Sequence, residues 1–193
     1  MKTKKQTIIF NFNDTNIIKD TKNIEIYNIL KNRVPKTRLS NKVYDFLISK
    51  TITNISSDID VVLIPESNNN ILKNICLFLD KKYIVIKKNN KNNILKDIKQ
   101  DTTIQKSQRL SILSNIQNNK KLQMVNFNSS QRSILSKYLF DFNFIELDKH
   151  KKYLILDDAL FTGHTVGAIK QNLNHNNLDY EEIIIFGFKN ERK

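Results

Sequence analysis

Residues 153–165 read Tyr-Leu-Ile-Leu-Asp-Asp-Ala-Leu-Phe-Thr-Gly-His-Thr, an apolar run that ends on two adjacent carboxylates and a short loop with hydroxyl groups and a glycine. The apolar run predicts a buried parallel strand. From Thr165 onward, apolar residues recur at helical spacing, so the residues between form a strand-to-helix turn. The chain has three glycines, and two of them, Gly163 and Gly167, lie in or just after this turn, where we expect the backbone to need the freedom of glycine.

Such a turn suits a phosphate group. The free N–H groups at a helix start carry partial positive charge, and Thr162 and Thr165 add hydroxyl donors. Asp157 and Asp158 would repel a phosphate unless they face something else, such as sugar hydroxyls or a hydrated divalent cation. The stretch therefore predicts a site for a phosphorylated sugar.

A simpler interpretation is that the aspartates begin a turn and a threonine caps a helix. We favour a functional site, because a cap explains one polar residue and not the whole spaced set. A Walker-type phosphate loop is excluded, because no lysine follows the glycine at the required place.

The motif resembles the ribose-5-phosphate loop of type I phosphoribosyltransferases: four apolar residues, two acids, three variable positions and Thr-Gly-x-Thr. The resemblance implies that Asp157 and Asp158 are the catalytic pair that contacts the ribose 2- and 3-hydroxyls. It also implies that the 5-phosphate is bound by Ala159, Leu160, Phe161, Thr162, Gly163, His164 and Thr165. Phe161 departs from the family pattern, since many members carry a small or hydroxylated residue there. His164 stands at a variable position and is interpreted as a bystander.

A second strand-to-loop segment covers residues 61–68, Val-Val-Leu-Ile-Pro-Glu-Ser-Asn. A proline that ends a strand before a helix cap would also explain it. The carboxyl ends of parallel strands share one edge, so both loops would face one crevice. The segment resembles the pyrophosphate-binding loop of the same family, with Asn68 in place of a glycine. The pyrophosphate ligands implied are Pro65, Glu66, Ser67 and Asn68, with Lys87 and Lys88 after the next strand.

Apolar segments alternate with helical ones along the chain, which predicts an α/β fold: an open, mostly parallel twisted sheet flanked by helices, with a small variable hood. The expected strands are 7–12, 60–64, 83–87, 122–125, 153–156 and 182–186, and helices are expected to begin near Ser40, Asn69, Thr103, Ser129 and Thr165. Residues 58–193 would form the core of one compact domain, and residues 1–57 the hood. By the resemblance, residues 89–126 would hold the mobile loop that closes over the substrate.

Composition narrows the class of protein. With 193 residues, 39% of them hydrophobic, the chain can bury one substantial core. Cys76 is the lone cysteine, so an internal disulfide is excluded, and we expect a cytoplasmic protein with no membrane segment. The net charge of +13 admits nucleic acid as a partner. We do not favour it, because lysine, asparagine and isoleucine are abundant together all along the chain.

The resemblance implies an enzyme that uses phosphoribosyl pyrophosphate (PRPP) and Mg²⁺ to transfer ribose-5-phosphate to a nitrogenous base. The donor's phosphates would hold most of the Mg²⁺ coordination, and Asp157 and Asp158 would contact the ion through water. The acceptor base is not readable; residues 1–57, Phe186 and Phe188 are candidates to hold it, although core packing is the commoner role of such rings. Family members are frequently dimers, and the oligomeric state stays open.

Two other classes of function stay open at this point. A regulator that keeps the PRPP site, has lost transfer and binds nucleic acid would carry the same motif. A purely structural interaction module would have no affinity for PRPP.

Overall fold

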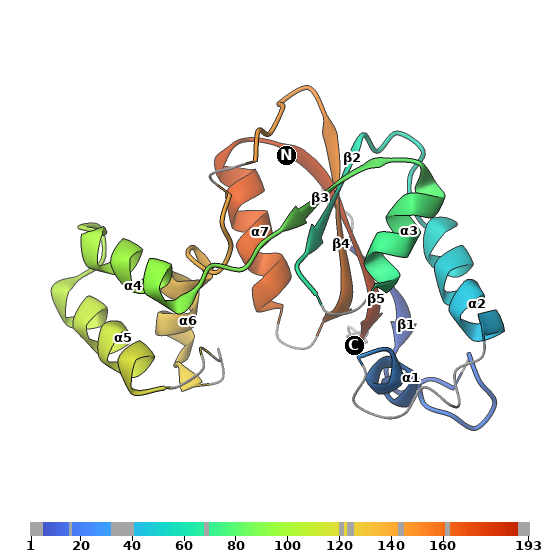
Figure 1. Cartoon of the computed structure of the whole chain (residues 1–193), viewed down its shortest axis with the longest axis horizontal. Coiled ribbons are helices and arrows are strands. Elements are labelled where there is room, and N and C mark those ends of the chain that lie inside the picture. Colours follow the sequence, from blue (N-terminus) through green and yellow to red (C-terminus); the bar gives the residue numbers. More distant parts are fainter. Residues whose placement is uncertain are drawn as a thin grey trace, which may run out of the picture.

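The computed structural model describes residues 6–15, 17–31, 41–67, 70–119, 122, 126–142, 145–160 and 163–188, and its centre is a five-stranded sheet in the order β1-β5-β4-β2-β3 (Figure 1). The strands are β1 (Gln6–Asn11), β2 (Val61–Pro65), β3 (Lys82–Ile86), β4 (Lys152–Leu160) and β5 (Asp179–Gly187). All four neighbouring pairs are parallel, which confirms the predicted open α/β sheet. Of the further strand expected at 122–125, residues 123–125 lie outside the described residues, and Leu122 is not in a strand.

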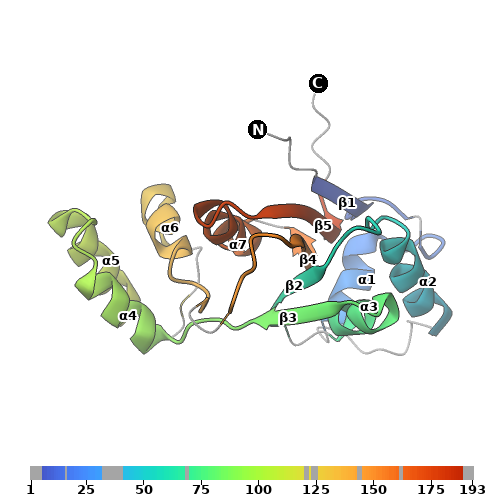
Figure 2. The same ribbon diagram turned by 90° about the horizontal axis from the view of Figure 1, so that it is seen from above.

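Helices cover both faces of the sheet (Figure 2). Helices α1 (Asn23–Leu30), α2 (Asn41–Ile52) and α3 (Ile71–Leu79) pack against one face, where Leu154 and Leu156 point. Helix α7 (His164–His175) packs against the other face, together with Ile155. Because successive side chains of a strand point to opposite faces, a strand covered on both sides must be apolar at every position. This explains the unbroken apolar run at the start of β4.

The order of the strands places a crevice between β2 and β4. Strand β2 continues through α3 to β3 on its outer side, whereas β4 continues through α7 to β5 on the opposite side. The two connections therefore diverge, and ligands of open parallel sheets bind at such a switch point. Leu63 pairs with Ile155, so Pro65 and Asp157 each follow two residues later on neighbouring strands.

Three helices form a separate cluster between β3 and β4 in sequence: α4 (Lys91–Gln100), α5 (Lys106–Asn118) and α6 (Ser129–Ser136). They project from the side of the sheet in both views (Figures 1 and 2). Their own small core includes Ile94 and Ile98 of α4 packed with Ile112 and Ile116 of α5. Most of the described residues of 89–126, the region that the resemblance implies to hold a mobile loop, are therefore helical. Each isoleucine pair is spaced four residues apart, a helical signal within the segment.

The helices expected near Ser40, Asn69, Ser129 and Thr165 begin within two residues of those positions, and the one expected near Thr103 begins at Lys106. Helices α1 and α4 are additions to the expected set. The asparagine-rich start of α4 has the composition of a turn, but the Asn90 side chain caps the helix by accepting a hydrogen bond from the Asn93 amide at 2.8 Å. No helix in the described ranges has the length and apolar character needed to span a bilayer.

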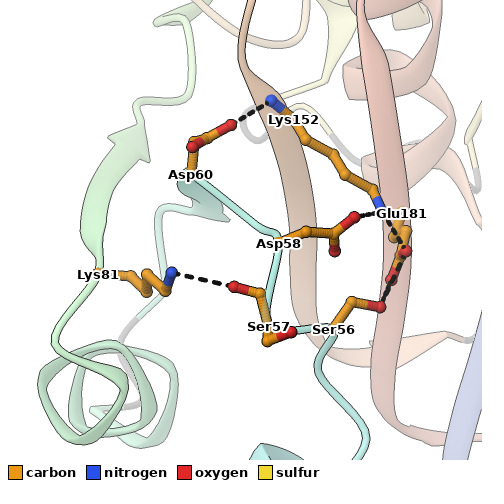
Figure 3. Close-up of polar contacts among 7 residues, drawn as sticks. All are labelled: Ser56, Ser57, Asp58, Asp60, Lys81, Lys152 and Glu181. Atoms are coloured by element: carbon orange, nitrogen blue, oxygen red, sulfur yellow. Dashed lines mark hydrogen bonds and ion pairs between the residues drawn. The ribbon is translucent and has the colours of Figure 1, made fainter.

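A polar network ties the amino ends of the strands together, at the edge opposite the crevice (Figure 3). Lys152 Nζ lies 2.7 Å from Glu181 Oε1 and 2.8 Å from Asp58 Oδ2, and hydrogen bonds to Asp58 and Glu181 raise the pKa of the lysine. Burial acts to raise the pKa of Glu181, but hydrogen bonds from Lys152 and Ser56 outweigh it and lower that pKa. Each of these three charged groups has a partner of opposite sign, so we interpret the network as a structural clamp.

Candidate functional site

A cavity of about 530 Å³ opens at the carboxyl edge of β2 and β4. It is lined by most of the residues that the two sequence motifs predicted: Pro65, Glu66, Ser67, Lys88, Asp157, Asp158, Ala159, Leu160, Gly163, His164 and Thr165. Segments almost a hundred residues apart in the chain thus share one cavity. Val166 of α7, Tyr27 of α1 and Lys31, which directly follows α1, complete the lining.

The lining as described leaves four of the predicted site residues to account for. Phe161, Thr162 and Asn68 lie outside the described residues. Lys87 is described, and its carbonyl accepts a hydrogen bond from the Asp141 amide at 3.0 Å, but the residue does not line the cavity. Its neighbour Lys88 does line it, and the Lys88 amide donates to Glu66 Oε2 at 3.1 Å.

The two aspartates lie within β4 and not beyond its end. Ala159 and Leu160, which we expected in the phosphate loop, still pair with Phe186 and Gly187 of β5. The strand continues because its neighbour β5 extends equally far and supplies backbone partners for these residues. Strand β4 thus ends at Leu160 and α7 begins at His164, so fewer residues separate them than the motif suggests.

Both carboxyl groups are deeply buried, with exposed fractions of 5% for Asp157 and 4% for Asp158. The Asp158 amide donates to Asp157 Oδ1 at 2.8 Å. Burial and then the neighbouring Asp158 charge raise the pKa of Asp157, and these effects outweigh its own hydrogen bond and the positive charges of Lys31 and Lys88. Raised pKa values of this kind, in a cavity and beside a second acid, are typical of functional sites.

Asp158 is held by a contact that the sequence did not suggest. Lys31, directly after the last residue of α1, forms an ion pair with Asp158. Lys31 Nζ also donates to Ser67 Oγ at 2.9 Å, and Ser67 Oγ lies 3.3 Å from Asp158 Oδ2. Three parts of the fold thus meet at one point. Nothing in the sequence distinguishes Lys31 from the many other lysines of the chain, because the contact depends on how α1 packs.

The aromatic residues proposed for the base divide into two groups. Phe186 is fully buried, stacked on Phe12 and packed against Phe10, so it belongs to the core. Phe188 is 48% exposed and packs against Phe12. Tyr27 lines the cavity, but it is also buried, with its ring packed edge-on against Phe12 and 5.9 Å from the ring of Phe186. It lies in the segment expected to form the hood.

The start of α7 forms the remaining wall. Gly163 precedes the helix in a left-handed conformation, with φ of +69°, and Gly163, His164 and Thr165 line the cavity. The N–H groups of a first helical turn have no partners within the helix and bind anions readily. Gly167, in contrast, lies within α7, and apart from its chain neighbours and the backbone of its own helix no heavy atom of the described residues lies within 4 Å of the place that a Cβ would take there. The expectation that this position needs glycine is therefore wrong.

The two glycines predict opposite effects of alanine. In Gly163→Ala the new Cβ would lie 3.5 Å from Leu160 Cδ1, an ordinary contact, so the cost comes from the positive φ, about 1–2 kcal/mol of unfolding free energy. Gly167→Ala should stabilise by about 0.5–1 kcal/mol, because alanine is the better helix former. Urea unfolding of both variants measures the two changes in unfolding free energy. Equal changes of the same sign would contradict the assigned conformations.

No protein-family model and no curated protein matches this chain in sequence. Solved structures do resemble it. One is adenine phosphoribosyltransferase from Saccharomyces cerevisiae, with TM-score 0.41 and 14% identity over 82% of this chain and 72% of that one. Another is adenine phosphoribosyltransferase from Thermoanaerobacter pseudethanolicus, with TM-score 0.45 and 12% identity over 77% and 82%. A third is a hypoxanthine phosphoribosyltransferase from Staphylococcus aureus, with TM-score 0.42 and 11% identity over 86% and 73%. The fold itself is defined by the strand order β1-β5-β4-β2-β3 and the parallel register of its pairs.

Proposed function

We propose that this protein is a phosphoribosyltransferase, which uses PRPP and Mg²⁺ to transfer ribose-5-phosphate to a nitrogenous base with release of pyrophosphate. The observation that carries the proposal is the shared cavity at the β2–β4 switch point. There the buried pair Asp157 and Asp158 meets the start of α7 on one side and Ser67 with Lys88 on the other. These are the groups that a sugar with a phosphate at one end and a pyrophosphate at the other needs.

The geometry supports a specific placement of the donor. The 5-phosphate would lie at the start of α7, where free N–H groups and the Thr165 hydroxyl are available. The ribose hydroxyls would face Asp157 and Asp158. The pyrophosphate would then extend toward Ser67 and Lys88, with Lys87 and Asn68 as the further predicted ligands.

The carboxylates of the cavity suit a substrate-bound Mg²⁺ ion. The described residues contain no group of three or more histidine, cysteine or acidic side chains able to hold a metal by themselves. Mg²⁺ typically binds through one or two carboxylates together with substrate phosphates and water. Glu66, Asp157 and Asp158 supply such carboxylates beside the proposed pyrophosphate position. Mg²⁺ bound there would neutralise part of the charge that develops on the departing pyrophosphate.

The protein's part in the reaction would be orientation and electrostatics. A nitrogen atom of the base attacks C1 of the ribose, the bond from C1 to the pyrophosphate oxygen breaks, and positive charge builds on the sugar ring. Carboxylates fixed beside that ring stabilise the charge without having to reorganise, and lysines stabilise the leaving group.

Pyrophosphate release provides the direct test. We expect PRPP with Mg²⁺ to give a binding signal in titration calorimetry, and one acceptor from a panel of purines, pyrimidines, orotate and nicotinate to give pyrophosphate release well above the no-acceptor rate. Absence of any heat with PRPP and Mg²⁺ would refute the proposal. Binding of PRPP without release across the whole panel would favour the inactive regulator instead, which should also bind nucleic acid with strong salt dependence.

A further inference from the structure

Lys31 occupies the junction of the two proposed substrate loops. Its ammonium group is paired with Asp158 of β4 and donates to Ser67 in the loop after β2. The side chains of this ion pair are 20% and 6% exposed, so little water competes for the contact. The residue itself follows the carboxyl end of α1, where a positive charge is favourable for the helix.

An ammonium group has three N–H donors, and among the described residues Asp158 and Ser67 take two of them, while Nζ also lies 5.8 Å from the centroid of the Tyr27 ring. Because the residue also lines the cavity, a ligand there can accept from the third donor. The pair of Lys31 and Ser67 has the composition of a lysine-activated serine nucleophile. That interpretation fails here, because an ammonium group that donates to both partners has no lone pair left to accept the serine proton.

The charges of the cavity give Lys31 a second effect. Three acids line it, Glu66, Asp157 and Asp158, against the lysines Lys31 and Lys88. A pyrophosphate entering beside Ser67 would be repelled by Asp158 if that carboxylate had no cation next to it. Lys31 neutralises this carboxylate at the side that faces Ser67, so the local field there becomes compatible with an anion.

We propose that Lys31 is a pyrophosphate-binding residue, which uses its remaining N–H donor to contact the leaving group and joins α1 to the two substrate loops. The inference rests on the proposed function and deepens it. Lysine binds phosphate as a point charge, so the ammonium group needs no particular orientation to make this contact. In the proposed placement the 5-phosphate of the donor binds at the start of α7 and not beside Ser67.

The test separates the two halves of the donor. Pyrophosphate and ribose 5-phosphate, each with Mg²⁺, are titrated calorimetrically into the wild type, Lys31→Met and Lys31→Arg. We expect Lys31→Met to weaken pyrophosphate binding by about 10- to 100-fold, the usual effect of one lost charged hydrogen bond. Ribose 5-phosphate affinity should change by less than about threefold, and Lys31→Arg should recover most of the pyrophosphate affinity because the charge is kept.

Two controls address folding and indirect effects. Lys22→Met removes an exposed lysine at the other end of α1 and should leave both affinities unchanged. The second control is Lys31→Met in an Asp158→Asn background, where the loss of pyrophosphate affinity should persist if Lys31 touches the ligand itself. Its disappearance there would show that Lys31 acts only through Asp158, and would overturn the inference.

Other outcomes also decide the question. Unchanged pyrophosphate affinity in Lys31→Met overturns the role of Lys31 and leaves the proposed function standing. Equal losses for both ligands overturn it as well, since they would indicate a general disturbance of the cavity. If the wild type binds neither ligand, the proposed function fails and the role of Lys31 fails with it.

Discussion

Replacing Asp158 by asparagine is expected to lower the rate of pyrophosphate release from PRPP by at least about 100-fold, on the scale of losing one preorganised charge at a transition state. The neutral amide cannot stabilise positive charge on the ribose ring, and it cannot hold Lys31 by an ion pair. Steady-state kcat and kcat/KM with the best acceptor measure the effect. Asp157→Asn should also abolish turnover.

Asp60→Asn is the matched control. Asp60 Oδ2 accepts from the Lys152 amide at 2.8 Å, at the opposite edge of the sheet and outside the cavity (Figure 3). The same chemical change there should leave turnover within about threefold of the wild type, since it removes no group that faces the cavity. Full activity in Asp158→Asn would eliminate the catalytic role that we assign to the acidic pair.

Asp157→Asn is expected to make the protein more stable at neutral and higher pH, by roughly a few kcal/mol of unfolding free energy. The pKa of Asp157 is raised in the folded protein, chiefly by burial and then by Asp158. A raised carboxyl pKa stabilises the fold below the ordinary value near 4, and this contribution is lost as the pH rises through the raised value. Asparagine does not titrate and still offers an oxygen to the Asp158 amide, so the variant avoids this loss.

Denaturant unfolding between pH 4 and pH 8 checks the sign. The unfolding free energy of Asp157→Asn should exceed that of the wild type least at pH 4, and this difference should increase toward pH 8. Asp158→Asn serves as the comparison, because it removes a carboxylate that has a cation partner and leaves Lys31 without it. A constant difference across the pH range would show that Asp157 carries no raised pKa.

The increase in stability expected from Asp157→Asn also has a consequence for the functional interpretation of this residue. A buried acid that lowers stability at neutral pH, as we expect of Asp157, has no structural advantage over an apolar residue at the same place in β4. Functional sites commonly keep such unfavourable groups because the ligand or the reaction requires them. The predicted increase in stability and the predicted loss of turnover therefore belong to the same residue.

Local sequence patterns predicted those parts of the fold in which the residue types themselves indicate burial or a turn. The apolar run before Asp157 indicates a strand covered on both sides, and Leu154 and Ile155 do point to opposite cores. The loop with Gly163 indicates a turn, and this glycine does adopt a positive φ. The same reasoning fails at Gly167, because a glycine in sequence does not reveal whether its backbone is left-handed or simply helical.

Some of the wrong expectations had a readable signal against them and others had none. Ile94 with Ile98 has the spacing of a buried helix face, although α4 was not among the expected helices. The extension of β4 through Ala159 and Leu160 has no local signal, since it depends on the length of the neighbouring strand β5. Backbone pairing between strands is a property of two segments, and one segment does not encode it.

By itself, the sequence determined the fold class and predicted the chemistry of the two loops, because apolar periodicity and the order of acids, hydroxyls and glycine are local properties. Only the tertiary structure decided that both loops border one cavity, since the strand order sets β2 beside β4. It alone also placed Lys31, at the end of α1, against Asp158. An ion pair between residues so far apart in the chain depends on how a helix packs on a sheet, and no local pattern in the sequence predicts that packing.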